Sequence, residues 1–310
     1  MEKEKLIRTI ESVKAEHLTG IVGSPVGHSL SPFLHEAAFS KLGMKGYKYI
    51  KIEADKKFLP EAVEILKEHN FLGFNVTMPD KEAITYLCDE LSDEAKLMHS
   101  VNTVKIVDGK LLGYNTDCMG FYMALKKNNV TAEGKNMILM GSGGAARAIL
   151  TGACINKVKR LDVFARPGDK YNMLKTQVEE LEKAGYQTEI RLHNLNSKVE
   201  LYRTIEKTDI LVNGTSVGMD TSKPADNKKG PYITNNMLAP KTLIPDTTCY
   251  HTGLFVADVV YFPKMTRFLE DAKDFGCRYM NGLDMLFFQA DLAFKIWHDK
   301  EMPIEILEKQ

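Results

Sequence analysis

The sequence predicts an α/β protein built from two domains. Short apolar strands alternate with helices over residues 18–76, and the same alternation starts afresh at residue 136. Strands that alternate with helices form parallel sheets, with the helices packed against them. The chain of 310 residues is also long enough for about two domains. We therefore expect a first α/β domain with a parallel-type sheet and a second domain of the same class.

The first series begins with a helical segment at 2–17 and a strand at 18–23 that ends in glycine. The next helix has clear end signals: Ser31 as N-cap, Pro32 at its first position and Gly43 beyond its end. Asp108-Gly109 between two apolar strands indicates a two-residue hairpin. The other elements are expected as strands at 47–52, 71–76, 101–107 and 110–114, and as helices at 58–69, 81–88, 93–98 and 117–128.

The second series opens with a buried strand at 136–140 that runs into a glycine-rich turn at 141–144. Further strands are expected at 160–165, 187–191, 209–213 and 255–262, and helices at 145–154, 170–184, 201–207 and 266–275. Residues 221–231, rich in Pro, Asn, Lys and Gly, predict a long surface loop. An apolar helix at 282–299 carries Trp297, the only tryptophan, and its packing partner cannot be read from periodicity. A domain boundary is expected near 118–135.

Composition excludes several classes of protein. Lys and Arg together number 41, as do Asp and Glu, so there is no basic excess to favour nucleic acid as a partner. No apolar run reaches the roughly 20 residues that span a membrane. The five cysteines are an odd number without C-x-x-C spacing, which argues against a disulfide framework or a zinc site. The charged N-terminus has no apolar signal region. We therefore expect a cytoplasmic protein.

The turn at 141–146 fits the pattern G-x-G-x-x-A between a strand and a helix. Gly141 allows a tight turn, Gly143 lets the backbone approach a pyrophosphate, and the small last residue lets helix and strand pack closely. The helix N-terminus offers N–H groups and a positive dipole to the anion. This context predicts a Rossmann-like domain that binds a dinucleotide, with a purely structural turn as the alternative.

The end of the following strand selects between NAD and NADP. Arg166 is the first polar residue beyond this strand and favours NADP, because an arginine can hold the 2′-phosphate. Asp169 could instead serve the ribose of NAD if the loop folds back, whereas Asp162 lies too early in the strand. The sequence thus favours NADP(H) and leaves NAD(H) as the alternative.

The first domain carries polar side chains where its strands end. Ser29 and Ser31 follow the first strand, and Asn75, Thr77 and Lys81 follow the strand at 71–76, where parallel-sheet proteins place their ligands. Each has a plainer interpretation: turn and N-cap duty for the serines, and a solvated first-turn position for the lysine. Two further candidates occur downstream, Asn102 and Asp117, the second of which would suit a helix N-cap.

Two other kinds of site are not favoured. No G-x-S-x-G sequence occurs, which argues against a serine hydrolase. His28 and His35 have no third ligand near them in the sequence, so no metal is proposed.

Together these motifs resemble the shikimate dehydrogenase family, in family order and over nearly the whole chain. The matches are G-x-P-x-x-H-S-x-S-P at 23–32, N-V-T-x-P-x-K at 75–81, V-N-T at 101–103, G-x-N-T-D at 113–117, G-x-G-G-A at 141–145, N-G-T-x-x-G-M at 213–219, D-V-V-Y-x-P at 258–263 and G-x-x-M-L-x-x-Q-A at 282–290.

The resemblance implies reversible hydride transfer between NADPH and 3-dehydroshikimate, which yields shikimate for aromatic amino-acid biosynthesis. It implies Lys81 as the catalytic lysine with Asp117 as its partner, and no metal. The implied substrate-binding residues are Ser29, Ser31, Asn75, Thr77, Asn102, Tyr261 and Gln289. The implied cofactor-binding residues are Gly141, Gly143, Gly144, Ala145, Arg166, Asp169, Thr215 and Gly282. It also returns the last helix to the first domain, so that the expected domains are 1–117 plus 282–310, for substrate, and 118–281, for NAD(P).

Departures from the family pattern leave alternatives open. Ala165-Arg166-Pro167 stands where the family has Asn-Arg-Thr, which resembles the quinate/shikimate dehydrogenase branch, whose members can use NAD and quinate. A dinucleotide-bound sensor without activity is a third interpretation, which the presence of Lys81 and Asp117 disfavours. The segment near 221–254 is longer than the corresponding segment expected for the family, and it has no assigned role. The sequence does not determine the oligomeric state, and a homodimer is one expectation.

Overall fold

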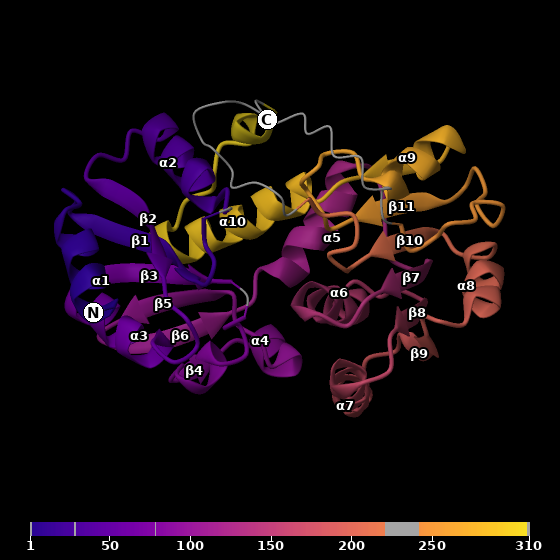
Figure 1. The fold of residues 1–310 in the computed structure, drawn as a ribbon, viewed down its shortest axis with the longest axis horizontal. Helices are drawn as coiled ribbons and strands as arrows, with labels where there is room; N and C mark the ends of the chain where they lie inside the picture. The colour runs from indigo at the N-terminus through magenta and orange to yellow at the C-terminus, as the bar shows by residue number, and fades with distance from the viewer. Residues whose placement is uncertain (1, 28, 78, 221–241, 309–310) are drawn as a thin grey trace. The chain divides into compact units, whose positions relative to one another are not determined.

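The computed structural model describes residues 2–27, 29–77, 79–220 and 242–308. They divide into two compact units, Met1–Thr116 with Gln289–Gln310 (unit 1) and Asp117–Phe288 (unit 2) (Figure 1). Each unit is built around one six-stranded sheet accompanied by helices, which confirms the α/β class. The chain passes from unit 1 to unit 2 after Thr116 and returns to unit 1 after Phe288. The sequence analysis placed these two boundaries after residues 117 and 281.

The sheet of unit 1 has the order β2-β1-β3-β5-β6-β4. Its first three strands are parallel, β5 and β6 form an antiparallel hairpin on β3, and β4 is parallel to β6. The expected parallel-type sheet is therefore mixed, because the hairpin at Asp108-Gly109 reverses the chain. Both of these residues have positive φ, 50° and 76°, as a two-residue hairpin turn requires. The strands are β1 (His17–Gly23), β2 (Tyr47–Glu53), β3 (Phe71–Val76), β4 (Glu90–Leu91), β5 (Thr103–Val107) and β6 (Lys110–Tyr114).

The helices of unit 1 correct two local expectations. The helix expected at 81–88 is only the 3-10 turn η1 (Ile84–Tyr86), where poor helix formers precede the extended β4. Ser31 is the first residue of its helix rather than the N-cap, because the hydroxyl of Ser29 accepts the Ser31 N–H at 3.2 Å and Leu30 takes the cap position. Gly43 lies beyond the helix end with φ +64°, as expected. The helices are α1 (Glu2–Glu11), α2 (Ser31–Lys41), α3 (Leu59–Glu68), α4 (Asp93–Met98) and α11 (Glu305–Glu308).

Helix α10 (Leu283–His298) brings its second half to the sheet of unit 1. The Trp297 indole N–H donates to the Val104 carbonyl at 2.9 Å, and a Cβ at Gly73 would lie only 2.2 Å from Trp297 Nε1. Gly73 and Phe74 are consecutive in β3, so their side chains face opposite sides of the sheet. Phe74 belongs to a core cluster that includes residues of α1 and α3. Because Gly73 has no side chain, the Trp297 indole can lie against β3 at this position.

The sheet of unit 2 is entirely parallel, with the order β12-β11-β10-β7-β8-β9. The order reverses between β7 and β10, which is the topology of a Rossmann-like domain and confirms that expectation. Its strands are β7 (Asn136–Met140), β8 (Arg160–Ala165), β9 (Glu189–Asn194), β10 (Ile210–Asn213), β11 (Phe255–Asp258) and β12 (Arg278–Met280). Its helices are α5 (Asp117–Lys127), α6 (Gly144–Ile155), α7 (Asp169–Lys183), α8 (Lys198–Ile205) and α9 (Arg267–Asp274), with the start of α10.

The segment at 221–254 is described only in part. Residues 221–241, which contain the predicted loop, lie outside the described residues. The rest of the segment contributes Ile244, Cys249, Tyr250 and Leu254 to a core cluster of unit 2. No helix among the described residues is long and apolar enough to cross a membrane.

The contact between Gly73 and Trp297 predicts a large effect of one methyl group. Gly73→Ala would place a Cβ 2.2 Å from Trp297 Nε1 and 2.3 Å from the Val104 carbonyl oxygen. Overpacking of this kind costs about 3 kcal/mol of unfolding free energy. Denaturant unfolding followed by Trp297 fluorescence measures this loss. Gly27→Ala is the control, since its Cβ would have no neighbour within 4 Å. Equal stability of the two variants would contradict the packing.

His298 predicts that unit 1 loses stability in acid. Burial, and then the neighbouring His17, Lys105 and Lys300, lower the pKa of His298 to about 4. The unfolded chain takes up this proton near pH 6.5, so stability is complete above that pH and falls as the pH drops from 6.5 towards 4. Burial lowers the pKa of His35 in the same direction.

We expect the melting temperature reported by Trp297 fluorescence to fall by about 5 °C between pH 7.5 and 5. His298→Phe keeps an aromatic ring among Phe39, Tyr47 and Phe294 but cannot titrate. Its melting temperature should therefore depend less steeply on pH. A profile as steep as that of the unsubstituted protein would show that His298 does not contribute.

Candidate active site

The predicted residues of unit 1 lie on segments that are tied together by main-chain hydrogen bonds. Val76, at the end of β3, donates its N–H to the Asn102 carbonyl at 2.8 Å, and Val101 donates to the Lys81 carbonyl at 2.8 Å. The Thr77 N–H donates to the Val22 carbonyl of β1 at 3.0 Å. The loops that carry Thr77, Lys81 and Asn102 are therefore held side by side at the carboxyl ends of β1 and β3.

A buried network joins Asn75 to Asn102. The Asn75 side-chain amide donates to the Asn102 carbonyl at 3.1 Å and to Thr103 Oγ1 at 3.0 Å. Thr103 in turn donates to Asn102 Oδ1 at 2.9 Å, and the main-chain N–H of Thr116 donates to the same oxygen at 2.8 Å. Asn75, Asn102, Thr103 and Thr116 are all 4% exposed or less. Buried amides of this kind hold one orientation, because any other leaves polar groups without partners.

Tyr49 is a member of this network that sequence reasoning missed. It lies on β2, 4% exposed, and its hydroxyl donates to Asn75 Oδ1 at 2.7 Å. Tyr49 stands in an ordinary alternating strand, so nothing in its local sequence marks it. Its role depends on the pairing of β2 with β1, which brings it beside β3.

The other predicted catalytic and substrate-binding residues described next are either partly exposed or buried. Lys81 is partly exposed, and its carbonyl also accepts from Thr85 Oγ1 at 3.1 Å, which fixes its main chain. Ser29 uses its hydroxyl oxygen as the acceptor for the Ser31 N–H. Gln289, 9% exposed, lies within α10. Asp117, 8% exposed, is the first residue of α5 in unit 2 and follows Thr116 directly.

In unit 2, the turn after β7 has the shape that a pyrophosphate needs. Gly141 has φ +126°, and a Cβ there would lie 2.9 Å from Thr215 Cγ2 and 3.0 Å from the Gly214 carbonyl oxygen. Only glycine suits this position. A Cβ at Gly143 or Gly144, by contrast, would meet nothing within 4 Å, and no side chain caps the N-terminus of α6. Open space at these Cβ positions, beside a helix N-terminus at the point where the strand order reverses, fits a bound dinucleotide phosphate.

A buried carboxylate holds the facing loop after β10. Asn213 Oδ1 accepts the N–H and the hydroxyl of Thr215 at 3.0 and 2.7 Å, and Asn213 Nδ2 donates to Asp258 Oδ1 at 2.9 Å. Asp258 also accepts from Thr266 Oγ1, the N-cap of α9, at 2.7 Å. Burial raises the pKa of Asp258 to about 6 although three hydrogen bonds oppose this. Sequence reasoning quoted Asp258 within a motif but gave it no role; it anchors Thr215 through Asn213.

The end of β8 carries the residues expected to choose the cofactor. Arg166 and Asp169 are both exposed. Asp169 is the first residue of α7, where a carboxylate stabilises the helix N-terminus, so it has a structural reason to be acidic. Asp162 is 2% exposed, and its carboxylate is engaged by Arg160 and His193 at 2.9 and 2.8 Å.

The last two predicted residues of unit 2 follow β11. Tyr261 is partly buried, and burial raises the pKa of its hydroxyl. A Cβ at Gly282 would lie 2.1 Å from the Val259 carbonyl oxygen, so close packing accounts for this glycine. The Gly282 N–H donates to the Val260 carbonyl oxygen at 3.0 Å. Its expected contact with the cofactor stays a prediction.

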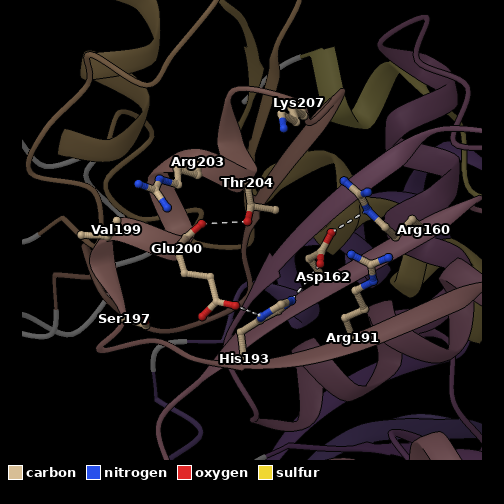
Figure 2. A pocket seen from close by; sticks show the side chains of 10 residues that line it. All are labelled: Arg160, Asp162, Arg191, His193, Ser197, Val199, Glu200, Arg203, Thr204 and Lys207. Atoms are coloured by element: carbon tan, nitrogen blue, oxygen red, sulfur yellow. Dashed lines mark hydrogen bonds and ion pairs between the residues drawn. The ribbon is translucent and has the colours of Figure 1, made fainter.

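A separate hollow of about 430 Å³ lies between β8, β9 and α8 (Figure 2). His193 stands at its wall between Asp162 and Glu200, each 2.8 Å from one ring nitrogen. Four cationic side chains also line the hollow: Arg160, Arg191, Arg203 and Lys207. None of the predicted site residues lines it. Among the residues that the structure describes, no three His, Cys, Asp or Glu side chains are grouped as a metal site requires.

Comparisons with known proteins agree with both halves of this description. Residues 21–104 match the family model of the shikimate dehydrogenase substrate binding domain. A shikimate dehydrogenase (NADP(+)) of Streptococcus pneumoniae is 40% identical over 93% of this chain and 93% of its own.

Solved structures extend the likeness to the fold of the whole chain. Shikimate 5-dehydrogenase from Listeria monocytogenes, in complex with shikimate and NAD, aligns with a TM-score of 0.84 at 36% identity, over 94% of this chain and 95% of that one. Quinate dehydrogenase from Corynebacterium glutamicum, in complex with NAD, aligns with a TM-score of 0.79 at 25% identity, over 94% and 97%. With its motifs in order, its Rossmann-like unit and these relatives along nearly its whole length, this chain belongs to the shikimate dehydrogenase family.

Proposed function

We propose that this protein catalyses the reversible NADP(H)-dependent reduction of 3-dehydroshikimate to shikimate, as an oxidoreductase acting on a CH–OH group. The observation that carries the proposal is the 40% identity over 93% of the chain to a shikimate dehydrogenase (NADP(+)). The site geometry supports it independently. Unit 1 holds the polar side chains of Tyr49, Asn75 and Asn102 in one network, and unit 2 presents a glycine turn at the switch point of its sheet.

In this proposal Lys81 is the catalytic acid and base. Reduction of a ketone leaves an alkoxide, and an ammonium beside it can stabilise the charge and donate the proton. The main chain of Lys81 is pinned by Val101 and Thr85, so the long side chain has a fixed origin. Asp117 is assigned as the carboxylate partner of Lys81. Ser29, Ser31, Asn75, Thr77, Asn102, Tyr261 and Gln289 are assigned to the carboxylate and hydroxyls of the substrate.

The cofactor residues follow from the turn geometry of unit 2. The N–H groups of the turn at Gly141, Gly143, Gly144 and Ala145 would hold the pyrophosphate, with Thr215 and Gly282 beside them, and Arg166 would hold the 2′-phosphate. When bound, the nicotinamide supplies or takes up the hydride. The exposed guanidinium of Arg166 favours NADP(H), and NAD(H) stays the alternative with Asp169 near the ribose.

A second candidate function is quinate oxidation with NAD. The sequence Ala165-Arg166-Pro167 and the likeness to a quinate dehydrogenase favour it, while the serine pair at 29 and 31 favours shikimate. A cytoplasmic location and a homodimer belong to the same proposal. None of the five cysteines, all among the described residues, forms a disulfide bond, which suits a reducing compartment.

The test is steady-state oxidation of shikimate and of quinate, each with NADP and with NAD, on the purified protein and on Arg166→Ala. We expect the highest kcat/KM for shikimate with NADP. In Arg166→Ala the KM for NADP should rise about tenfold or more, since a charged hydrogen bond is lost, and the KM for NAD should change less than twofold. Comparable efficiency with quinate and NAD would establish the second candidate. No turnover with any pair would refute both.

Lys81→Ala should lower kcat about a thousandfold and leave the affinity for shikimate nearly unchanged, because the ammonium acts on charge that develops in the transition state. Lys96→Ala is the matched control, a surface lysine paired with Asp93 at 3.2 Å, and should retain full activity. Stopped-flow hydride transfer and equilibrium shikimate binding separate the two effects. Near-normal turnover by Lys81→Ala would remove the lysine from the mechanism.

A further inference from the structure

The hydrogen-bond network around Asn75 has only one consistent direction. A main-chain carbonyl can only accept, so the Asn75 atom that lies 3.1 Å from the Asn102 carbonyl oxygen must be its NH2 group. The oxygen of Asn75 then faces Tyr49. Because that oxygen carries no proton, Tyr49 is the donor of the 2.7 Å hydrogen bond between them.

This direction limits what each amide can offer to a ligand. Both N–H bonds of Asn75 are used, by the Asn102 carbonyl and by Thr103 Oγ1, so Asn75 has only acceptor capacity left. Asn102 is the opposite case, because its Oδ1 already accepts from Thr103 and from the Thr116 N–H. Its side-chain NH2 group is a donor, and one of its N–H bonds is given to Thr116 Oγ1 at 3.0 Å.

Aromatic neighbours pack against the Tyr49 ring and hold it in place. His35, 0% exposed, stacks on it with ring centroids 4.2 Å apart and planes 9° from parallel. Trp297 lies on another side, with centroids 6.2 Å apart. Burial raises the pKa of Tyr49 well above its usual value, so its hydroxyl keeps the proton that it donates.

We propose that Tyr49 is a positioning residue whose hydroxyl fixes the side chain of Asn75, and that Asn75 consequently accepts a hydrogen bond from a substrate hydroxyl and does not bind the carboxylate. Tyr49 and Asn75 lie on β2 and β3, which are not neighbours in the sheet, and a single hydrogen bond joins their side chains. This inference rests on the proposed function, which assigns Ser31 and Asn75 to the substrate. Tyr49 itself does not take part in hydride or proton transfer.

Tyr49→Phe tests the proposal, because it keeps the ring that His35 stacks on and removes only the hydroxyl. The KM for shikimate should rise about fivefold, the value for one lost neutral hydrogen bond. The kcat and the KM for NADP should change less than twofold. Tyr47→Phe on the same strand is the matched control, since the Tyr47 hydroxyl has no hydrogen-bond partner among the described residues; all its constants should stay unchanged. An unchanged KM for shikimate in Tyr49→Phe, or an equal loss in both variants, would overturn the proposal.

A measurement without turnover separates this inference from the proposed function. Hydrogen exchange of the Asn75 side-chain NH2, followed by NMR, should be slow in the unsubstituted protein and in Tyr47→Phe, and about tenfold faster in Tyr49→Phe. Fast exchange in the unsubstituted protein would refute the network even if shikimate is oxidised. Inactivity of the unsubstituted protein towards shikimate, with slow exchange, would refute the proposed function and the substrate role of Asn75 while leaving Tyr49 as the residue that orients Asn75.

Discussion

Asn102 is the residue on which the ordered loops of unit 1 depend. Its carbonyl accepts hydrogen bonds from the Val76 N–H and the Asn75 amide, and its side-chain oxygen accepts from Thr103 and Thr116. Four acceptor positions on one residue thus join the end of β3, the start of β5 and the last residue of the first segment of unit 1. Since a buried polar group without a partner costs about 1–3 kcal/mol, these segments cannot move apart independently.

In unit 2 a buried carboxyl group joins several segments in a comparable way. Asp258 is 1% exposed and collects hydrogen bonds from Asn213, Val260 and Thr266. It therefore joins the carboxyl ends of β10 and β11 to the first turn of α9. Through Asn213 it also places Thr215 against Gly141, so the two loops at the switch point of the sheet are packed on each other. A buried carboxylate here contributes order at the mouth of the turn, where the backbone must stay open to an anion.

Sequence reasoning reached the class of the fold and most of its elements, because helix periodicity, capping residues and turn glycines are local. Gly43, Asp108-Gly109 and the turn at 141–144 all adopt the backbone that was expected of them. Two local predictions were wrong. Leu30 and not Ser31 is the N-cap, because the Ser29 hydroxyl accepts the Ser31 N–H. The helix expected at 81–88 is a single 3-10 turn that precedes the short strand β4. The mixed pairing of the first sheet depends on which strands meet, and periodicity does not carry that information.

For the site, the sequence by itself determined which chemical groups are present and in what order along the chain: the ammonium of Lys81, the amides of Asn75 and Asn102, the serine pair and the glycine turn. Tertiary structure decided how these groups can be used. Tyr49 gained a role only when strand pairing carried it beside β3, and Trp297 found its place only because Gly73 leaves space on the sheet. Each side chain carries its donors and acceptors as a property of its own residue type. Which of them remain for a ligand depends on neighbours supplied by segments far apart in the sequence.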